Sequence, residues 1–316
     1  MNKNNDLLKV IFNQGDRGAI VPFSRVLDIK NDMMELKNGE YHTQWLDHMV
    51  NLMTDVLEKY IPSGISFKPR SLISVVIPNP KTMLQFAYQG KFFNCIVPPH
   101  YTNWNVNNRR VLDYISDYLK PMGFSAEISV NFPHKMLAVH CGLGFYGRNN
   151  ICYSEEFGSY IQIMTYLSDI DCDEEKWFPL SRMESCEKCT ACVTSCPTGA
   201  IDSRRQLINS DRCITFYDEL PGEIPEWLEN EVHNCIIGCI RCQDCCPGNA
   251  NNKSNIKPGV VFSEEETTEL LNYKNSKPYS AQLAAKIDAM GIFQEYLDSS
   301  VLPRNLSILL QNMKAK

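Results

Sequence analysis

The sequence contains no long apolar run. No stretch approaches the ~20 consecutive apolar residues that a helix needs to cross a bilayer, and the N-terminal segment MNKNNDLLKVIF lacks the apolar core of a signal peptide. These absences argue against a transmembrane or exported protein. We therefore expect a cytoplasmic protein without a membrane partner.

An excess of positive charge is also missing. The formal net charge is −6, which excludes a protein whose whole surface is built for nucleic acid but is compatible with a local basic patch. Hydrophobic residues make up 44% and charged residues 22%, as in ordinary soluble globular proteins. The length of 316 residues predicts about two domains.

Cysteine is scarce in the first part of the chain. Four of the fourteen cysteines precede residue 186, whereas the other ten lie between residues 186 and 246. Structural disulfides are rare in the cytoplasm, so this concentration indicates metal binding. We predict an N-terminal domain over residues 1–180, a cluster-binding domain over 181–255 and a C-terminal helical segment over 256–316 that packs on the cluster module.

The cysteine-rich segment opens with CEKCTACVTSCPTG, residues 186–199. Its C-x-x-C-x-x-C-x-x-x-C-P spacing is that of bacterial ferredoxins, in which three close thiolates hold one 4Fe–4S cluster and the fourth cysteine reaches a second cluster. The spacing therefore predicts a second group of cysteines. GCIRCQDCCPGN, residues 238–249, supplies that group and again ends in a Cys-Pro pair, while Cys213 lies alone between the two runs.

The two runs predict a crossed assignment of thiolates to two clusters. Cys235 and Cys245 are left over and are expected to serve in packing, with Cys245 close enough to replace Cys246 if the register differs. Zinc is the alternative metal, because paired C-x-x-C motifs often bind it, but zinc does not require such runs. Two clusters in series indicate electron transfer. The predicted ligands are Cys186, Cys189, Cys192 and Cys246 for cluster one, and Cys196, Cys213, Cys239 and Cys242 for cluster two.

The segment before residue 180 mixes strand and helix patterns. The β-branched run SLISVVIP (71–78) predicts a buried strand, and MLQFAYQGKFFNCIVPP predicts two strands around a Gln-Gly turn. NRRVLDYISDYLKPMG predicts an amphipathic helix, and SYIQIMTYLSDI (159–170) predicts another strand. The alternation predicts an α+β protein with an α/β N-terminal sheet domain. Near the C-terminus, Ser263 and Glu266 form a capping box that opens a helix, and two further helical patterns follow.

The segment CGLGFYGRNN places Gly142, Gly144 and Gly147 in a G-x-G-x-x-G pattern. A dinucleotide fingerprint needs a strand before the glycines and a helix after them, but HKMLAVHC before them is helical and no helical pattern follows. We interpret the segment as a loop that lets backbone approach a large ligand, with a purely structural turn as the alternative. The six histidines show no pairing at ligand spacing and are expected to be surface or core residues, with His134 the better site candidate.

Several blocks resemble one known family. AVHCGLGFYGRNN, FGSYIQIMTYLSDI, CEKCTACVTSCPTGAID, RCITFYDE, GCIRCQDCCPGN and LPRNLSILLQN, spread over roughly residues 125–312, resemble the epoxyqueuosine reductase family in content and order. The resemblance implies a nitroreductase-like N-terminal domain, a ferredoxin-like double-cluster module, and a cobalamin that receives electrons and reduces an epoxide of a queuosine precursor in tRNA. It also implies corrinoid contacts from Gly142, Gly144, Gly147, Arg148 and Asn149.

Departures from the family bear on the substrate. Asn131 stands at the position of the family's proton-donating aspartate, and an amide has no proton to release near neutral pH. The segment CIVPPHYTNW, with His100 and Tyr101, replaces the family's Arg-Asp-Tyr-His. We expect Asn131 to donate a hydrogen bond to the substrate and Tyr101 to supply the proton. Helical repeats that help many members hold tRNA do not follow Arg304 here, so tRNA is a disfavoured partner.

These observations favour a corrinoid-dependent iron–sulfur reductase that resembles epoxyqueuosine reductase but acts on another small-molecule or corrinoid-protein substrate. Three alternatives stay open: a true epoxyqueuosine reductase acting on tRNA, a corrinoid-reducing or corrinoid-processing protein that serves a partner enzyme, and a corrinoid-free electron carrier. We expect electrons to come from an external low-potential donor of the ferredoxin or flavodoxin type.

Overall fold

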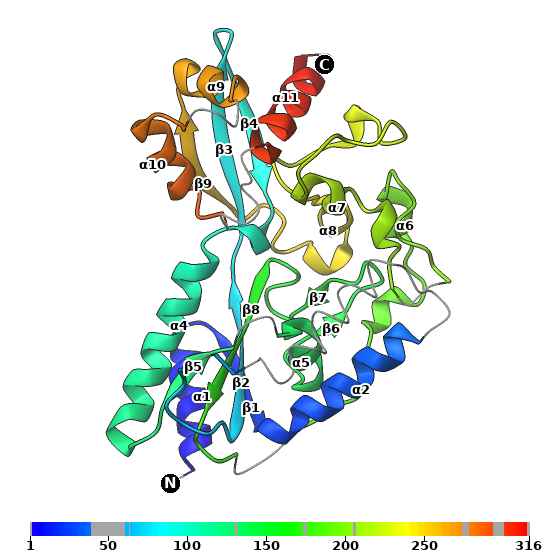
Figure 1. Cartoon of the computed structure of the whole chain (residues 1–316). Coiled ribbons are helices and arrows are strands. Elements are labelled where there is room, and N and C mark those ends of the chain that lie inside the picture. The colour runs from blue at the N-terminus through cyan, green and yellow to red at the C-terminus, as the bar shows by residue number, and fades with distance from the viewer. Residues whose placement is uncertain are drawn as a thin grey trace. The chain divides into compact units, whose positions relative to one another are not determined.

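The chain forms two compact units in a computed structural model (Figure 1). The structure describes residues 2–38, 61–62, 64–129, 132–172, 176–204, 207–273, 278–292 and 300–314. The first unit comprises residues 1–78, 105–189 and 205–207, and the second comprises 79–104, 190–204 and 208–316. Within the described ranges, no helix combines the length and the apolar character that a membrane crossing requires.

The first unit is built on a four-stranded sheet with the order β1-β2-β8-β5. Every neighbouring pair of strands in it is antiparallel. The mixed α+β class is therefore confirmed, whereas the α/β label for the N-terminal domain is wrong. Alternating helices and strands do not fix strand direction, because a helix can also connect antiparallel strands. The strands are β1 (Arg17–Pro22), β2 (Ser71–Pro78), β5 (Ala126–Ile128) and β8 (Ile161–Ser168).

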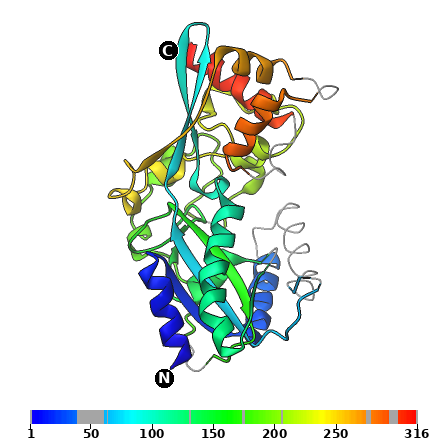
Figure 2. The same ribbon diagram turned by 90° about the vertical axis from the view of Figure 1, so that its left-hand side faces the viewer.

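The two central strands of this sheet are buried almost throughout. All of β8 and all of β2 except Pro78 are buried, as their apolar, β-branched sequences predict. Helices cover both faces of the sheet, with α1 and α4 on one face and α2 and α5 on the other (Figures 1 and 2). These helices are α1 (Lys3–Asn13), α2 (Val26–Lys37), α4 (Trp104–Leu119) and α5 (His134–His140).

Helix α4 confirms its predicted amphipathic pattern. Val111, Ile115 and Leu119 lie on one face and are fully buried. The helix ends where Pro121 and the left-handed Gly123, with φ of 80°, stop it. A second, two-stranded sheet in this unit pairs β6 (Phe145–Tyr146) with β7 (Cys152–Tyr153).

The second unit contains a three-stranded sheet with the order β4-β3-β9. Strands β3 (Lys81–Tyr88) and β4 (Lys91–Val97) form the predicted hairpin, and Gln89 and Gly90 both take positive φ in its turn. Strand β9 (Ile256–Phe262) pairs with β3 in parallel, across a long separation in sequence. Residues 79–104 therefore belong with the C-terminal elements, which no local pattern predicts. The division into three successive domains stays a prediction.

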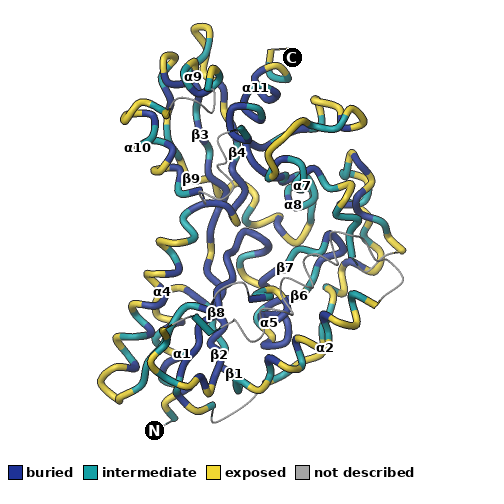
Figure 3. Tube along the Cα trace, in the orientation of Figure 1, coloured by how far each residue is buried: buried dark blue, intermediate teal, exposed yellow. Residues whose placement is uncertain are grey.

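Three helices cover this sheet: α9 (Glu264–Leu271), α10 (Ala281–Ala289) and α11 (Val301–Lys314). The predicted capping box of Ser263 and Glu266 is confirmed at the start of α9. Figure 3 shows the buried stretches of β3, β4 and α11 side by side, where they share one hydrophobic core. Helix α11 also contacts α7 (Ile214–Glu219), so this helix packs on both the sheet and the cysteine-rich segment.

Candidate functional site

Two short helices in the second unit carry parts of the two cysteine runs. Helix α6 (Ala191–Ser195) holds Cys192 and α8 (Arg241–Asp244) holds Cys242, and these helices pack against each other. The cysteine before each proline is extended: Cys196 has ψ of 109° and Cys246 has ψ of 126°. A proline pushes the preceding residue out of the helical region. Both Cys-Pro pairs therefore end a helical turn and redirect the chain at a predicted ligand.

Three predicted ligands of cluster two influence one another electrostatically. Burial raises the pKa of the Cys213 thiol, and the charge of Cys196 adds to the rise. Burial also raises the pKa of Cys239 to about 11, and the charge of Cys213 acts in the same direction. Cys242, which lies on α8, is the fourth predicted ligand of cluster two. Thiols with raised pKa values keep their protons at neutral pH, so iron must displace those protons when it binds.

The predicted ligands of cluster one are divided between the units. Cys186 and Cys189 belong to the first unit, and Cys192 and Cys246 belong to the second. Their assignment to one cluster stays a prediction from spacing. In the described part of the chain, no three His, Cys, Asp or Glu side chains stand close enough to ligate a single metal ion. The metal assignment therefore rests on cysteine spacing and family similarity.

The two leftover cysteines have local partners. Cys235 is fully buried, and its thiol donates to Oδ1 of Asn234 at 3.2 Å. The thiol of Cys245 donates to the carbonyl oxygen of Cys242 at 3.6 Å. These contacts fit the packing role predicted for both residues.

The glycine loop of the first unit is shaped by close packing. It follows helix α5 and leads into β6, so the strand–loop–helix context of a dinucleotide site is missing at this point. A Cβ atom on Gly144 would lie 2.7 Å from the carbonyl oxygen of Tyr153, and one on Gly142 would lie 2.8 Å from the Phe178 ring. Gly147 is crowded in the same way by Asn149 and Tyr153. These glycines allow backbone and side chains of the same unit to approach closely.

Arg148 connects this loop to the first cysteine run. Its side chain is nearly buried, at 8% exposure, and its guanidinium donates to the carbonyl oxygens of Cys186 and, at 3.2 Å, Cys189. Asn149 is also buried and donates to the Tyr153 hydroxyl at 2.9 Å. The family resemblance implied a cofactor contact for both residues, and nothing in the sequence indicated these hydrogen bonds. The structure shows that Arg148 fastens the backbone around two predicted cluster ligands.

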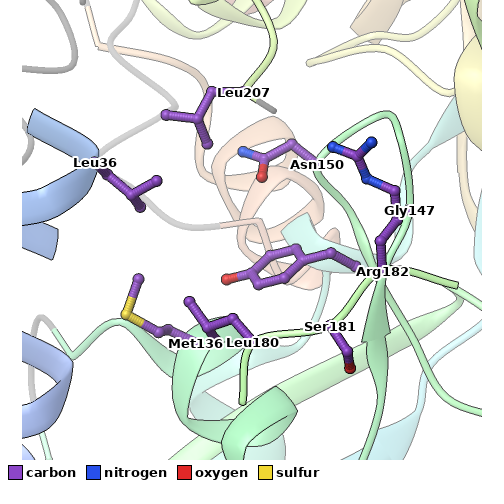
Figure 4. A pocket seen from close by; sticks show the side chains of 9 residues that line it. Leu36, Met136, Gly147, Asn150, Leu180, Ser181, Arg182 and Leu207 are labelled. Atoms are coloured by element: carbon purple, nitrogen blue, oxygen red, sulfur yellow. The ribbon is translucent and has the colours of Figure 1, made fainter. Parts of the chain in front are cut away.

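A pocket of about 340 Å³ opens beside the glycine loop in the first unit (Figure 4). Of the five residues predicted to contact a cofactor, Gly147 lines this pocket. Asn150, from the same loop, lines it as well. Helices α2 and α5 contribute Leu36 and Met136, so one side of the pocket is apolar. No sequence pattern indicated the remaining residues that line the pocket. The remaining lining residues are Tyr146, Leu180, Ser181, Arg182 and Leu207.

The two predicted catalytic residues have different outcomes. Asn131 lies outside the described residues. Tyr101 belongs to the second unit, is 6% exposed, and donates its hydroxyl proton in a hydrogen bond to Glu219. Its ring packs against Gly238, where a Cβ atom would lie 2.5 Å from the hydroxyl oxygen. The structure thus places Tyr101 beside the cysteine-rich segment, and its role as proton donor to a substrate stays a prediction.

His134, the histidine singled out in the sequence, and two further histidines contact other residues of the protein. Nδ1 of His134 lies 2.8 Å from the Thr165 hydroxyl. His140 lies 2.6 Å from the Phe178 carbonyl through Nδ1 and 2.7 Å from the Asp32 carboxylate through Nε2. His100 packs edge-on against Tyr101. These contacts fit histidines that stabilise the fold.

Comparison with known proteins identifies the cysteine-rich segment. Residues 185–249 match the family described as the 4Fe-4S double cluster binding domain. Over 172 residues the chain is 30% identical to the epoxyqueuosine reductase of Bacillus subtilis (strain 168), and the match covers 52% of this chain and 42% of that protein. The chain thus spans less than half the length of this curated relative.

Solved structures extend the similarity to nearly the whole chain. A crystal structure of selenomethionine-labelled epoxyqueuosine reductase matches with a TM-score of 0.70 and 20% identity, over 98% of this chain and 81% of that one. Epoxyqueuosine reductase with a tRNA-Tyr epoxyqueuosine-modified tRNA stem loop matches with a TM-score of 0.60 and 19% identity, over 92% of this chain and 82% of that one. Such identities establish a shared fold alone. The resemblance predicted from the motifs is confirmed: this chain is similar in sequence and in fold to epoxyqueuosine reductases, and it carries a double 4Fe–4S cluster binding domain.

Proposed function

We propose that this chain is a cytoplasmic iron–sulfur reductase of the epoxyqueuosine reductase type, whose two clusters deliver single electrons to a corrinoid. The observation that carries the proposal is the pair of cysteine runs, each ending in Cys-Pro, within a double-cluster domain. A bound corrinoid supplies a cobalt centre that accepts electrons and reduces the substrate. The chain's own residues hold the clusters, position the corrinoid and keep water away. A nitroreductase-like arrangement of the first unit is part of the proposal.

In this proposal the pocket beside the glycine loop would hold only one portion of a corrinoid. Its volume of about 340 Å³ lies near the lower limit for small-molecule sites, whereas a corrinoid is larger than a typical small ligand. Leu36 and Met136 give it an apolar wall, and Ser181 and Arg182 provide polar groups. We assign direct contact to Gly147 together with its neighbour Asn150. In this proposal the other predicted corrinoid residues, Gly142, Gly144, Arg148 and Asn149, shape the loop.

The substrate favoured by the comparisons is epoxyqueuosine in tRNA. The curated relative is named epoxyqueuosine reductase, and one structure of similar fold contains an epoxyqueuosine-modified stem loop. Sequence analysis placed a different substrate first and tRNA behind it. The comparisons reverse that order, so a tRNA anticodon stem loop becomes the first partner to test. The electron donor in this proposal is an external low-potential ferredoxin or flavodoxin.

A different substrate is the second candidate, and Asn131 is the observation that favours it. An amide at this position cannot release a proton to an epoxide oxygen near neutral pH. Reduction of a substrate that needs no acid at this position, including the corrinoid of a partner enzyme, is compatible with Asn131. In this candidate Asn131 donates a hydrogen bond to the substrate.

A stem-loop reduction assay separates the two candidates. The reconstituted, cobalamin-loaded protein is reduced anaerobically and mixed with an epoxyqueuosine-modified stem loop, and mass spectrometry follows the loss of one oxygen atom. The proposal expects conversion by the wild type and faster conversion by Asn131→Asp, which restores an acid. Conversion by Asn131→Asp alone supports the second candidate. Failure of both proteins overturns the epoxyqueuosine assignment, and failure to retain cobalamin points to a corrinoid-free electron carrier.

A further inference from the structure

Helix α7 of the second unit ends in two adjacent carboxyl groups, Asp218 and Glu219. Cys213, a predicted ligand of cluster two, is the N-cap residue directly before this helix. One short helix therefore links a cluster ligand to two acids. Neither acid has a part in the function proposed above.

Asp218 is buried opposite a histidine. Its side chain is 0% exposed and that of His233 is 1% exposed, and Oδ1 of Asp218 lies 2.8 Å from Nδ1 of His233. This contact is poorly aligned for a hydrogen bond, and neither side chain has another hydrogen-bond partner among the residues that the structure describes. Burial raises the pKa of Asp218 above its ordinary value, although His233 and Arg304 oppose the rise. Buried polar groups normally have hydrogen-bond partners, so this pair calls for a functional explanation.

Glu219 lies beside the same pair and shares a hydrogen bond with Tyr101. The Tyr101 hydroxyl donates to Oε1 of Glu219. Burial raises the pKa of Glu219 to about 7; the Tyr101 hydrogen bond opposes this rise and the charge of Asp218 adds to it. Glu219 thus changes its charge within the physiological pH range, which an ordinary glutamate does not.

The two acids act electrostatically on thiols of the cysteine-rich segment. Burial is the main reason that the pKa values of Cys213, Cys239 and Cys235 are raised. The charge of Glu219 adds to the rise at Cys213, and the charge of Asp218 adds to it at Cys239 and Cys235. Two of these three thiols are predicted ligands of cluster two. The influence is mutual, because any charge added at the thiolates acts equally on the acids.

Helix α11 fixes this arrangement from the other side. Asn305 donates to the carbonyl oxygens of Asp218 at 2.9 Å and Ile236 at 3.0 Å. Arg304 donates to the carbonyl oxygen of Tyr217 at 2.8 Å, and its positive charge lowers the pKa of Asp218. The groups around the acids are therefore the cation of Arg304, the imidazole of His233, the phenol of Tyr101 and the cluster-two thiols.

We propose that Asp218, Glu219 and His233 form a proton-accepting site that takes up one proton when cluster two gains one electron. The electron comes from the external low-potential donor and the proton from water, and both leave again on oxidation. The bond formed on reduction is an O–H or N–H bond within the site. An added negative charge favours protonation of nearby carboxylates. Proton uptake in turn offsets the charge and makes the electron easier to accept.

The test is a redox titration of the reconstituted protein at several pH values, followed by electron paramagnetic resonance. In the wild type, the midpoint potential of one cluster should fall as pH rises through about 7, by up to about 59 mV for each tenfold fall in proton concentration. Glu219→Gln should weaken this dependence, and the double variant Asp218→Asn/Glu219→Gln should abolish it. Glu223→Gln, which changes an exposed acid in the same segment, should leave it intact.

A milder variant guards against misfolding. Tyr101→Phe removes the hydrogen bond that favours the Glu219 carboxylate, so the pH at which the potential begins to level off should move upward. An infrared difference spectrum should show a protonated-carboxyl band on reduction that Glu219→Gln lacks. The proposal is overturned if the midpoint potential of the wild type does not change with pH, or if the double variant keeps the wild-type dependence of potential on pH.

The experiment uses no corrinoid and no tRNA. A flat potential with both clusters present contradicts the proton site alone. Absence of a second cluster contradicts the iron–sulfur assignment on which it rests. Failure of the stem-loop assay leaves the proton site unaffected.

Discussion

The glycine loop and the two cysteine runs are all short segments with little regular structure, but they are held in opposite ways. In the glycine loop, neighbouring atoms of the protein fill the space that a Cβ atom would need at Gly142, Gly144 and Gly147. In the cysteine runs, a proline ends a helical turn beside a predicted ligand in each run, and burial raises the pKa of the Cys239 thiol. The loop is thus shaped by packing within the protein, whereas we expect the geometry of the cysteine runs to depend on bound metal.

This difference teaches where each part of the function resides. Packing defines the shape of the pocket beside the glycine loop without a ligand. We expect metal binding to supply much of the stability around the cysteines, because it would join ligands that the unfolded chain does not hold together. Substitutions in the glycine loop should therefore lower the free energy of unfolding, whereas substitutions of the cysteine ligands should lower the metal content.

The largest expected effect concerns the cluster ligands. Cys213→Ser should lower the iron content from about eight to about four atoms per chain, because it removes one ligand of cluster two. Cys235→Ser is the matched control, since Cys235 is a buried cysteine outside both predicted sets. Iron analysis after anaerobic reconstitution measures both. Equal iron loss in the two variants would contradict the assignment of Cys213.

A smaller effect is expected at the arginine that joins the two segments. Arg148→Gln should reduce the free energy of unfolding of the first unit by about 1–3 kcal/mol, because buried carbonyl groups lose charged hydrogen-bond donors. Arg148→Lys keeps the charge but loses the planar fork, so it should restore part of that loss. Urea unfolding followed by circular dichroism measures the difference. Wild-type stability in both variants would show that Arg148 does not fasten the cysteine run.

Close packing of the glycine loop predicts a comparable but more local loss. Gly144→Ala should reduce the free energy of unfolding by about 1–3 kcal/mol, because the new methyl group meets the Tyr153 carbonyl oxygen. Gly18→Ala is the control, since its methyl group would meet the end of the flexible Ile11 side chain. The same unfolding experiment compares them. A larger loss at Gly18 would contradict the packing account of the loop.

The smallest expected effect is the pH dependence due to Glu219. Its folded pKa of about 7 lies above its ordinary value of 4.5, so the folded state holds a proton between these values that the unfolded state releases. This contribution to stability is present at low pH and is lost as pH rises through about 7. Glu219→Gln should flatten the decline in melting temperature over this range, whereas the exposed-site variant Glu223→Gln should not. An unchanged decline in Glu219→Gln would contradict the raised pKa.

Local patterns predicted the local parts of this molecule. Strand β2, the β3–β4 hairpin, α4 and the capping box of α9 follow from alternation, turn chemistry and helix periodicity within a few residues. The cysteine spacing predicted a double-cluster domain for the same reason, since ferredoxin ligands lie close together in sequence. These features need no knowledge of the rest of the chain.

Long-range contacts account for what the sequence did not predict. The parallel pairing of β3 with β9 joins segments separated by the whole cysteine-rich region. Arg148 meets the carbonyl groups of a segment about 40 residues away, and Tyr101 meets Glu219 across 118 residues. The family resemblance suggested a cofactor contact for Arg148, and residue type and neighbourhood suggested a proton donor for Tyr101, but their partners depend on how the whole chain folds.

Metal and cobalt analysis after anaerobic reconstitution with iron, sulfide and hydroxocobalamin tests the central claim most directly. Two 4Fe–4S clusters that serve a corrinoid predict about eight irons per chain and one retained cobalt after desalting, with the visible absorption of both groups. Four irons or fewer would contradict the crossed assignment of the cysteines. Eight irons without cobalt would contradict a corrinoid enzyme and leave a protein that only carries electrons.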